Sequence, residues 1–129
     1  MPIFCQTMGY RQMIIFKVLL YIRFVYMEII ELPDVLSFEW DRGNNQKNWV
    51  KHKVSVKESE EAFYDKRGLV LEDRKHSEQE KRYILFGKTK KERFLFIIYT
   101  LRNEKIRVIS ARDVKKKEVR FYEETIGIA

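Results

Sequence analysis

The fold is decided by the stretch Arg82-Tyr-Ile-Leu-Phe-Gly-Lys-Thr-Lys-Lys-Glu-Arg-Phe-Leu-Phe-Ile-Ile-Tyr-Thr-Leu-Arg-Asn-Glu-Lys-Ile-Arg-Val-Ile-Ser110. It contains three apolar runs, at residues 82–87, 94–101 and 106–110, which are separated by short polar segments. Such runs are typical of strands, and short polar connections are typical of antiparallel hairpins. The run at residues 94–101 is apolar on both faces, so we expect this strand to be central in the sheet and covered on both sides.

Two helices are predicted on the N-terminal side of these strands. Asp41 or Asn44 can cap a first helix that runs to about His52. Ser55 and Glu58 form a capping-box pattern, in which the hydroxyl and the carboxylate satisfy free amides at the start of a second helix. We therefore expect two consecutive helices ahead of the sheet.

The remaining elements follow from turn residues and short apolar runs. Residues 65–68 end the second helix, residues 69–71 form a short strand, and residues 72–81 form a polar loop. Asp113 can cap a last helix from about residue 115 to residue 124. The expected order is strand-helix-helix-strand-strand-strand-strand-helix, an α+β domain in which two N-terminal helices pack on an antiparallel sheet and a C-terminal helix follows.

The composition is that of one small basic domain. The chain has 129 residues, of which 45% are hydrophobic and 35% charged, enough for a single domain with a core. Lys and Arg outnumber Asp and Glu by 26 to 19, which gives a formal charge of +7. This excess favours a polyanion partner bound in a salt-dependent way, and a merely soluble basic surface is the alternative.

Several classes of site are excluded by residue counts and spacing. Cys5 is the single cysteine, so no intrachain disulfide can form, which fits a reducing compartment such as the cytoplasm. The two histidines and one cysteine form no zinc motif, and the five glycines lie too far apart for a phosphate-binding loop. We therefore expect no metal and no cofactor.

Residues 1–37 form an apolar N-terminal extension ahead of the predicted domain at residues 38–129. Charged residues such as Lys17 interrupt every window long enough to cross a bilayer, and no cleavage site of a signal peptide follows. We interpret residues 1–26 as upstream translation and Met27 as the candidate true start. A mass spectrum of the native protein that includes residues 1–26 would refute this interpretation.

A set of spaced motifs lies between Phe38 and Glu123. They are Phe-x-Trp-Asp at residues 38–41, Asn48, Lys51-His52, His-Ser-Glu-x-Glu-x-Arg at residues 76–82, Gly87, Tyr-Thr-x-Arg at residues 99–102, Arg-x-Ile-Ser-Ala-Arg at residues 107–112, and Tyr122. In these motifs the chain resembles the BrnT toxins of bacterial type II toxin–antitoxin systems. It departs from their pattern at Lys53, where glycine is frequent, and at Val56 and Val119.

The resemblance implies a small RelE-like domain that cleaves cellular RNA and thereby arrests growth. It also implies a cognate BrnA-like antitoxin with a DNA-binding domain, in a complex of two copies of each protein. Operator DNA would be bound only through the antitoxin, and no membrane is involved. Two alternatives stay open: a non-enzymatic basic module that binds nucleic acid or protein, and a toxin that has kept its fold but lost catalysis.

RNA cleavage without a metal requires a base for the 2′-hydroxyl, cations for the phosphate and an acid for the 5′-oxygen. A guanidinium can bind two phosphate oxygens at once, which makes arginines the candidate phosphate ligands. The predicted catalytic residues are Lys51, His52, Glu80, Arg82, Arg107 and Arg112. The predicted further RNA contacts are Arg102, Ser110 and Lys115.

These candidates also have structural interpretations. His52 can interact with the C-terminus of its helix, and Lys51 can be a solvated charge. Glu80 can form a salt bridge with Arg82 or an arginine of the sheet. A buried Arg107 would need a carboxylate partner, and an exposed Arg107 could contact RNA.

Other residues of the motifs are expected to have structural roles. His76 and Ser77 are expected to organise their loop. The aromatic residues that we expect in the core are Trp40, Trp49, Phe63 and Phe96.

Overall fold

The computed structural model describes residues 27–77 and 79–128. The elements follow the chain in the order β1 (Met27–Ile30), α3 (Lys47–His52), α4 (Val56–Phe63), β2 (Leu69–Asp73), a short 3₁₀ helix η1 (Arg74–His76), β3 (Arg82–Lys88), β4 (Phe94–Arg102), β5 (Lys105–Asp113) and α5 (Lys116–Ile128). This confirms the predicted α+β class and element order. The interpretation of residues 1–26 concerns residues outside those described.

The five strands form one antiparallel sheet in the order β1-β2-β3-β4-β5. Its middle strand is β3, so the expectation that residues 94–101 would be the central strand is wrong. The reason is that β1 pairs with β2 and forms the edge strand of the sheet on the side far from β4. The strand β4 is nevertheless internal, because it pairs with β3 on one side and with β5 on the other.

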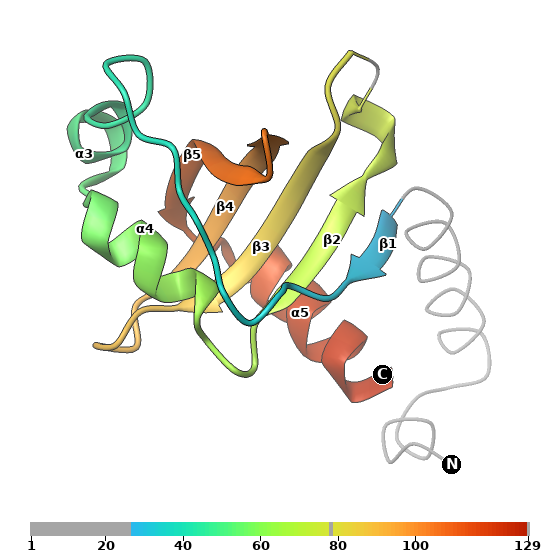
Figure 1. Cartoon of the computed structure of the whole chain (residues 1–129). Helices are drawn as coiled ribbons and strands as arrows, with labels where there is room; N and C mark the ends of the chain where they lie inside the picture. Colours follow the sequence, from blue (N-terminus) through green and yellow to red (C-terminus); the bar gives the residue numbers. More distant parts are fainter. Residues whose placement is uncertain (1–26, 78, 129) are drawn as a thin grey trace, which may run out of the picture.

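Helices cover both faces of the sheet, with α3 and α4 in front and α5 behind (Figure 1). On the α4 side, Phe63 packs against Tyr99 with ring centroids 5.0 Å apart. On the α5 side, Tyr122 packs against Phe94 at 4.8 Å. The prediction that residues 94–101 are covered on both sides is therefore confirmed. None of these described helices has both the length and the apolar character that crossing a bilayer requires.

The capping box of α4 forms as predicted. The Ser55 hydroxyl accepts a hydrogen bond from the Glu58 amide at 3.0 Å, and Glu58 Oε1 accepts one from the Ser55 amide at 3.1 Å. These two bonds satisfy amides that the first turn of a helix leaves free.

The predicted cap of α3 is wrong. This helix begins only at Lys47, and Gln46 before it provides no side-chain cap. Asp41 and Asn44 instead form a turn: Asn44 Oδ1 accepts from the Asp41 amide at 2.9 Å, and Asp41 Oδ1 accepts from the Gly43 amide at 2.8 Å. Their side chains satisfy this turn, so they are not available to a helix that starts later.

The predicted cap of the last helix is also wrong. Asp113 is the final residue of β5, and its carboxylate binds the Arg93 guanidinium at 2.8 Å. Glu118, inside the helix, accepts a hydrogen bond from the Lys115 amide at 2.9 Å and so serves the first turn.

The segment at residues 37–48 closes the outer edge of β5. Its bonds to β5 join the Ile106 amide to Ser37 O (2.8 Å), the Glu39 amide to Ile106 O (2.8 Å), Asn44 Nδ2 to Val108 O (3.2 Å), Lys47 Nζ to Ile109 O (3.3 Å) and the Ala111 amide to Asn48 Oδ1 (3.0 Å). The unpaired backbone groups of an edge strand can pair with a strand of another chain. The segment at residues 37–48 prevents this at β5, because it covers that edge. The buried Asn44 and Asn48 therefore have structural roles at this edge.

Candidate functional site

The strand register places three polar side chains in one row across the sheet, and two of them are predicted site residues. Thr100 of β4 pairs with Arg82 of β3 and with Arg107 of β5. Residues directly opposite one another in antiparallel strands point to the same face. Arg82 and Arg107 therefore lie on the same face, on either side of the buried Thr100.

Three further predicted residues share this face. Arg102 lies two positions after Thr100, and Ser110 and Arg112 lie opposite Ile98 and Phe96, which pack on the α5 side. We call the set the basic face; its residues are Arg82, Thr100, Arg102, Arg107, Ser110 and Arg112.

A bulge in β5 places the arginines of this strand on the same face of the sheet. Ile98 pairs with Ser110 and Tyr99 pairs with Val108, so Ile109 is an extra residue without an opposite partner. Arg107 and Arg112 are five positions apart, which in a regular strand would put them on opposite faces. The extra residue brings both onto the same face.

Three of the four arginines of the basic face are held by carboxylates, and Arg102 and Arg107 are two of them. Arg102 Nε donates to Glu80 Oε1 at 2.9 Å. Arg107 donates to Glu39 at 3.0 Å and to both oxygens of Asp41 at 2.7 and 2.9 Å. The predictions that Glu80 pairs with a sheet arginine and that Arg107 has a carboxylate partner are confirmed.

These pairs keep their carboxylates ionised. The hydrogen bond from Arg102 lowers the pKa of Glu80. The hydrogen bond from Arg107 lowers the pKa of Asp41 in the same way. Glu80 can therefore accept a proton at neutral pH, but it does not hold one to donate.

Arg112 is fixed to α5. Its guanidinium binds Glu118 through two hydrogen bonds, of 2.8 and 2.7 Å, and lies 4.2 Å from the centroid of the Phe96 ring. An anion would therefore compete with the Glu118 carboxylate for this guanidinium. Lys115, the residue before α5, is exposed beside this pair.

Arg82 differs from the other three arginines of the basic face. Its side chain is exposed, and residues 27–77 and 79–128 provide no carboxylate within ion-pair distance of it. Its backbone amide donates to Ser77 Oγ at 3.0 Å, which confirms that Ser77 organises the loop. A hollow of about 400 Å³ is lined by Lys75, His76, Gln79, Glu80 and Arg82. Arg82 is thus the guanidinium of this face that is ready to bind an anion.

Lys51 and His52 are not part of the basic face. They lie on α3, which contacts β5 and sits on the same side of the sheet as α4, whereas the basic face is on the α5 side (Figure 1). Lys51 is exposed and His52 is half-buried. The structure therefore brings the predicted arginines together with Glu80 and leaves the predicted imidazole and ammonium apart from them.

The surroundings of His52 also differ from expectation. Lys53 adopts a left-handed conformation with φ of 55°, which glycine would adopt without strain. Trp49 is 52% exposed, so its predicted place in the core is wrong. The inward face of α3 is occupied by Asn48, and Trp49 points outward beside the Lys53 ammonium, 5.4 Å from the ring centroid. Phe63 is buried as predicted, and Trp40 and Phe96 are partly buried against the cores.

Arg93 is a structural residue that the sequence did not reveal. It donates to the carbonyl oxygens of His52 at 3.0 Å and Lys53 at 2.7 Å, and to the carboxylates of Glu58 and Asp113 at 3.1 and 2.8 Å. It therefore ties the end of α3 and the start of α4 to the end of β5. In the sequence it is one more charge in a polar hairpin, and no motif marks it.

The ion pair between Arg93 and Asp113 predicts how the stability of the fold depends on pH in acid. Its hydrogen bond lowers the pKa of Asp113, so the unfolded chain binds protons more readily there. Stabilisation of this kind is complete above the unfolded pKa of about 4 and is lost as the pH falls through the folded pKa. We expect the urea concentration at the midpoint of unfolding to decrease when the pH is lowered from about 5 to about 3. The decrease should be smaller in Arg93→Met than in wild type.

The matched control for this experiment is Arg120→Met, at an exposed position of α5. It should keep the wild-type dependence on pH. If Arg93→Met showed the full wild-type fall as well, the ion pair with Asp113 would contribute nothing to acid stability.

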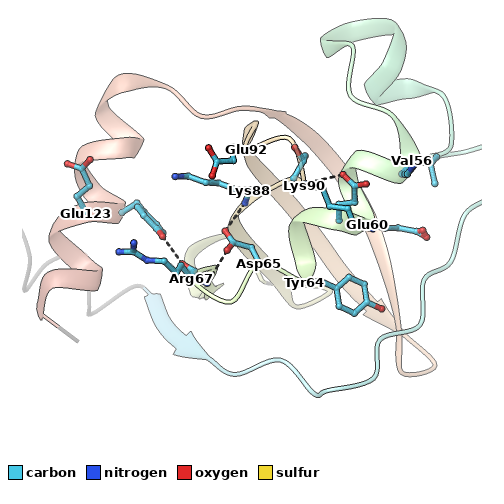
Figure 2. Close-up of a pocket in the computed structure, with 13 residues that line it drawn as sticks. Val56, Glu60, Tyr64, Asp65, Arg67, Lys88, Lys90, Glu92 and Glu123 are labelled. Carbon is cyan, nitrogen blue, oxygen red and sulfur yellow. Dashed lines mark hydrogen bonds between the residues drawn. The ribbon is translucent and has the colours of Figure 1, made fainter.

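A larger cavity than the hollow at Arg82 lies elsewhere, between α4, the hairpin after β3 and α5. It has a volume of about 1190 Å³ and includes none of the predicted site residues (Figure 2). Its charged groups are partly occupied: Asp65 accepts from the backbone amides of Arg67 and Lys88, and Glu61 accepts from the Lys90 amide. Within the described part of the chain, no group of three His, Cys, Asp or Glu side chains is arranged to hold a metal ion.

A comparison with protein-family models gives a match. A family model described as "Ribonuclease toxin, BrnT, of type II toxin-antitoxin system" matches residues 40–118, more than half of the 129-residue chain. No curated protein matches the chain. The matched range includes every residue of the basic face.

Proposed function

We propose a function from this premise: the chain belongs to the BrnT family of ribonuclease toxins of type II toxin–antitoxin systems. It is an endoribonuclease that cleaves cellular RNA without a metal ion and thereby inhibits growth. The observation that carries this proposal is the family match over residues 40–118. The basic face supports it, because four guanidiniums and the Glu80 carboxylate lie at one side of the sheet.

The reaction is attack of a 2′-hydroxyl on the neighbouring phosphorus. The bond from phosphorus to the 2′-oxygen forms, the bond to the 5′-oxygen breaks, and the products carry a 2′,3′-cyclic phosphate and a 5′-hydroxyl. Arg82 binds the phosphate, since its guanidinium is exposed and has no ion pair with a described residue. Glu80 takes the proton of the 2′-hydroxyl, because Arg102 keeps it ionised.

The other predicted site residues have separate places in this proposal. Arg102 holds Glu80 and reaches the RNA backbone with its exposed side chain. Arg107 and Arg112 contact RNA only where a phosphate replaces their carboxylates. Roles for Lys51, His52, Ser110 and Lys115 remain predictions.

The membership of a type II system implies an antitoxin partner. We propose that it is a BrnA-like protein with a DNA-binding domain, and that two copies of each protein form the complex. Operator DNA is then bound through the antitoxin alone, and the complex acts in the cytoplasm.

One observation favours a second candidate function. Three of the four guanidiniums of the basic face are already neutralised by carboxylates. A toxin that has lost catalysis but still binds its antitoxin would tolerate this arrangement.

Cleavage by the purified chain separates the two functions. We expect a single-stranded RNA to be cut in excess EDTA at the rate seen without EDTA, with cyclic phosphate ends on the products. Expression of the chain alone should arrest bacterial growth, and coexpression of the cognate antitoxin should restore it. Absence of both cleavage and arrest, at equal soluble expression, would contradict the enzyme and support the second function.

A further inference from the structure

The second histidine of the chain, His76, is held by a carboxylate. His76 is at the end of η1, and its Nδ1 lies 2.7 Å from Asp73 Oδ2. The His76 side chain is 62% exposed, whereas that of Asp73 is 14% exposed. Because an ionised carboxylate only accepts hydrogen bonds, we place the proton of this pair on Nδ1. The other ring nitrogen, Nε2, has no hydrogen bond to a residue that the structure describes.

His76 also lines the hollow that contains Glu80 and Arg82. An exposed imidazole oriented by a carboxylate, an ionised carboxylate and a guanidinium that has no ion pair with a described residue therefore border one hollow. These are the three kinds of group that metal-free RNA cleavage needs. His52, on α3, does not border it.

We propose that His76 is the general acid of the RNA cleavage described above, with Asp73 as its positioning residue. This inference rests on the proposed function. Glu80 removes the 2′-hydroxyl proton, the 2′-oxygen bonds to phosphorus, and the bond to the 5′-oxygen breaks. The protonated His76 gives its Nε2 proton to that oxygen, and the two groups return to their starting states by exchanging a proton through water.

The proton on His76 determines how the rate depends on pH. A histidine that acts as an acid is active when protonated, so the rate should fall on the alkaline side. The charged groups that face His76 are Asp73 at its Nδ1, and Glu80, Lys75 and Arg82 in the same hollow. Asp73→Asn should lower the rate as well, because the ring of His76 loses the carboxylate that orients it.

The decisive experiment compares two substrates. One is an ordinary RNA dinucleotide, and the other has sulfur in place of the 5′-oxygen at the cleaved bond, which leaves without needing a proton. His76→Asn should slow cleavage of the oxygen substrate about a hundredfold and leave cleavage of the sulfur substrate nearly unchanged. The alkaline fall in rate should disappear in His76→Asn and persist in His52→Asn.

Each other result overturns the inference. Equal slowing of both substrates by His76→Asn would assign His76 a purely structural role in its loop, with the enzyme itself intact. Loss of the alkaline fall in His52→Asn instead would assign the acid to α3. A wild-type chain that cleaves neither substrate would overturn the proposed function together with this inference. Thermal unfolding of each variant shows whether it is folded.

Discussion

Arg82→Ala should lower the rate of RNA cleavage about a hundredfold or more, the usual effect of removing one group that stabilises transition-state charge. The reason is that Arg82 is the guanidinium of the basic face that is exposed and not held by a described carboxylate. The same exposure predicts little cost to the fold. The unfolding temperature should stay within about 2 °C of wild type, as is usual for surface substitutions.

Arg120→Ala is the matched control for this variant. Arg120 is also an exposed arginine, but it lies on α5 and outside the basic face. Its removal should leave the cleavage rate and the growth arrest unchanged. Full activity of Arg82→Ala, or equal loss in both variants, would contradict a specific phosphate contact at Arg82.

Gly87→Ala should destabilise the domain by about 3 kcal/mol, at the upper end of what overpacking usually costs. Gly87 is buried in β3 where α4 crosses it, and a Cβ there would lie 2.2 Å from the carbonyl oxygen of Ala62. This atom belongs to the helix backbone, so α4 would have to move away from the sheet. We expect the unfolding temperature to fall by roughly 10 °C.

Gly127→Ala tests whether this cost comes from the close approach. Gly127 lies near the end of α5, and an added Cβ there meets no atom within 4 Å. Alanine is the better helix former, so the variant should be neutral or stabilised by about 0.5 kcal/mol. Similar destabilisation of both variants would contradict the packing argument for Gly87.

Local patterns in the sequence predicted most of the fold. The apolar runs and short polar segments of residues 82–110 predicted three antiparallel strands, and the pair of Ser55 and Glu58 predicted the start of α4. These features depend on residues close together in the chain. The predictions that Asp41 and Asp113 cap helices were wrong. Their carboxylates instead bind residues far away in the sequence, Arg107 and Arg93 respectively.

The candidate site depended on long-range geometry that no local pattern contains. The bulge at Ile109 puts Arg107 and Arg112 on one face, although their spacing in a regular strand would separate them. The sequence predicted a salt bridge of Glu80 with Arg82 or an arginine of the sheet, and the structure shows Arg102 as the partner. The positions of the two histidines could not be predicted in this way, because α3 contacts β5 and η1 contacts β1, which lie at opposite edges of the sheet.

The ion pairs of the basic face also show why residue type alone did not identify the site. Arg107 and Arg112 carry the same charge as Arg82, but they fix the loop at residues 39–41 and α5 to the sheet. Replacing either would change the fold as well as any contact with RNA, because it would leave a carboxylate unpaired. Variants at Arg82 are therefore more informative about chemistry.

The central claim is that RNA binds across the basic face, with the cleaved phosphate at Arg82. It is tested most directly by a crystal structure of the chain with an RNA oligonucleotide that carries a 2′-deoxy sugar at the cleavage site and so cannot react. We predict a phosphate oxygen within about 3 Å of the Arg82 guanidinium, with the modified sugar facing Glu80. An oligonucleotide bound along α3 instead, with no phosphate near Arg82, would contradict the claim.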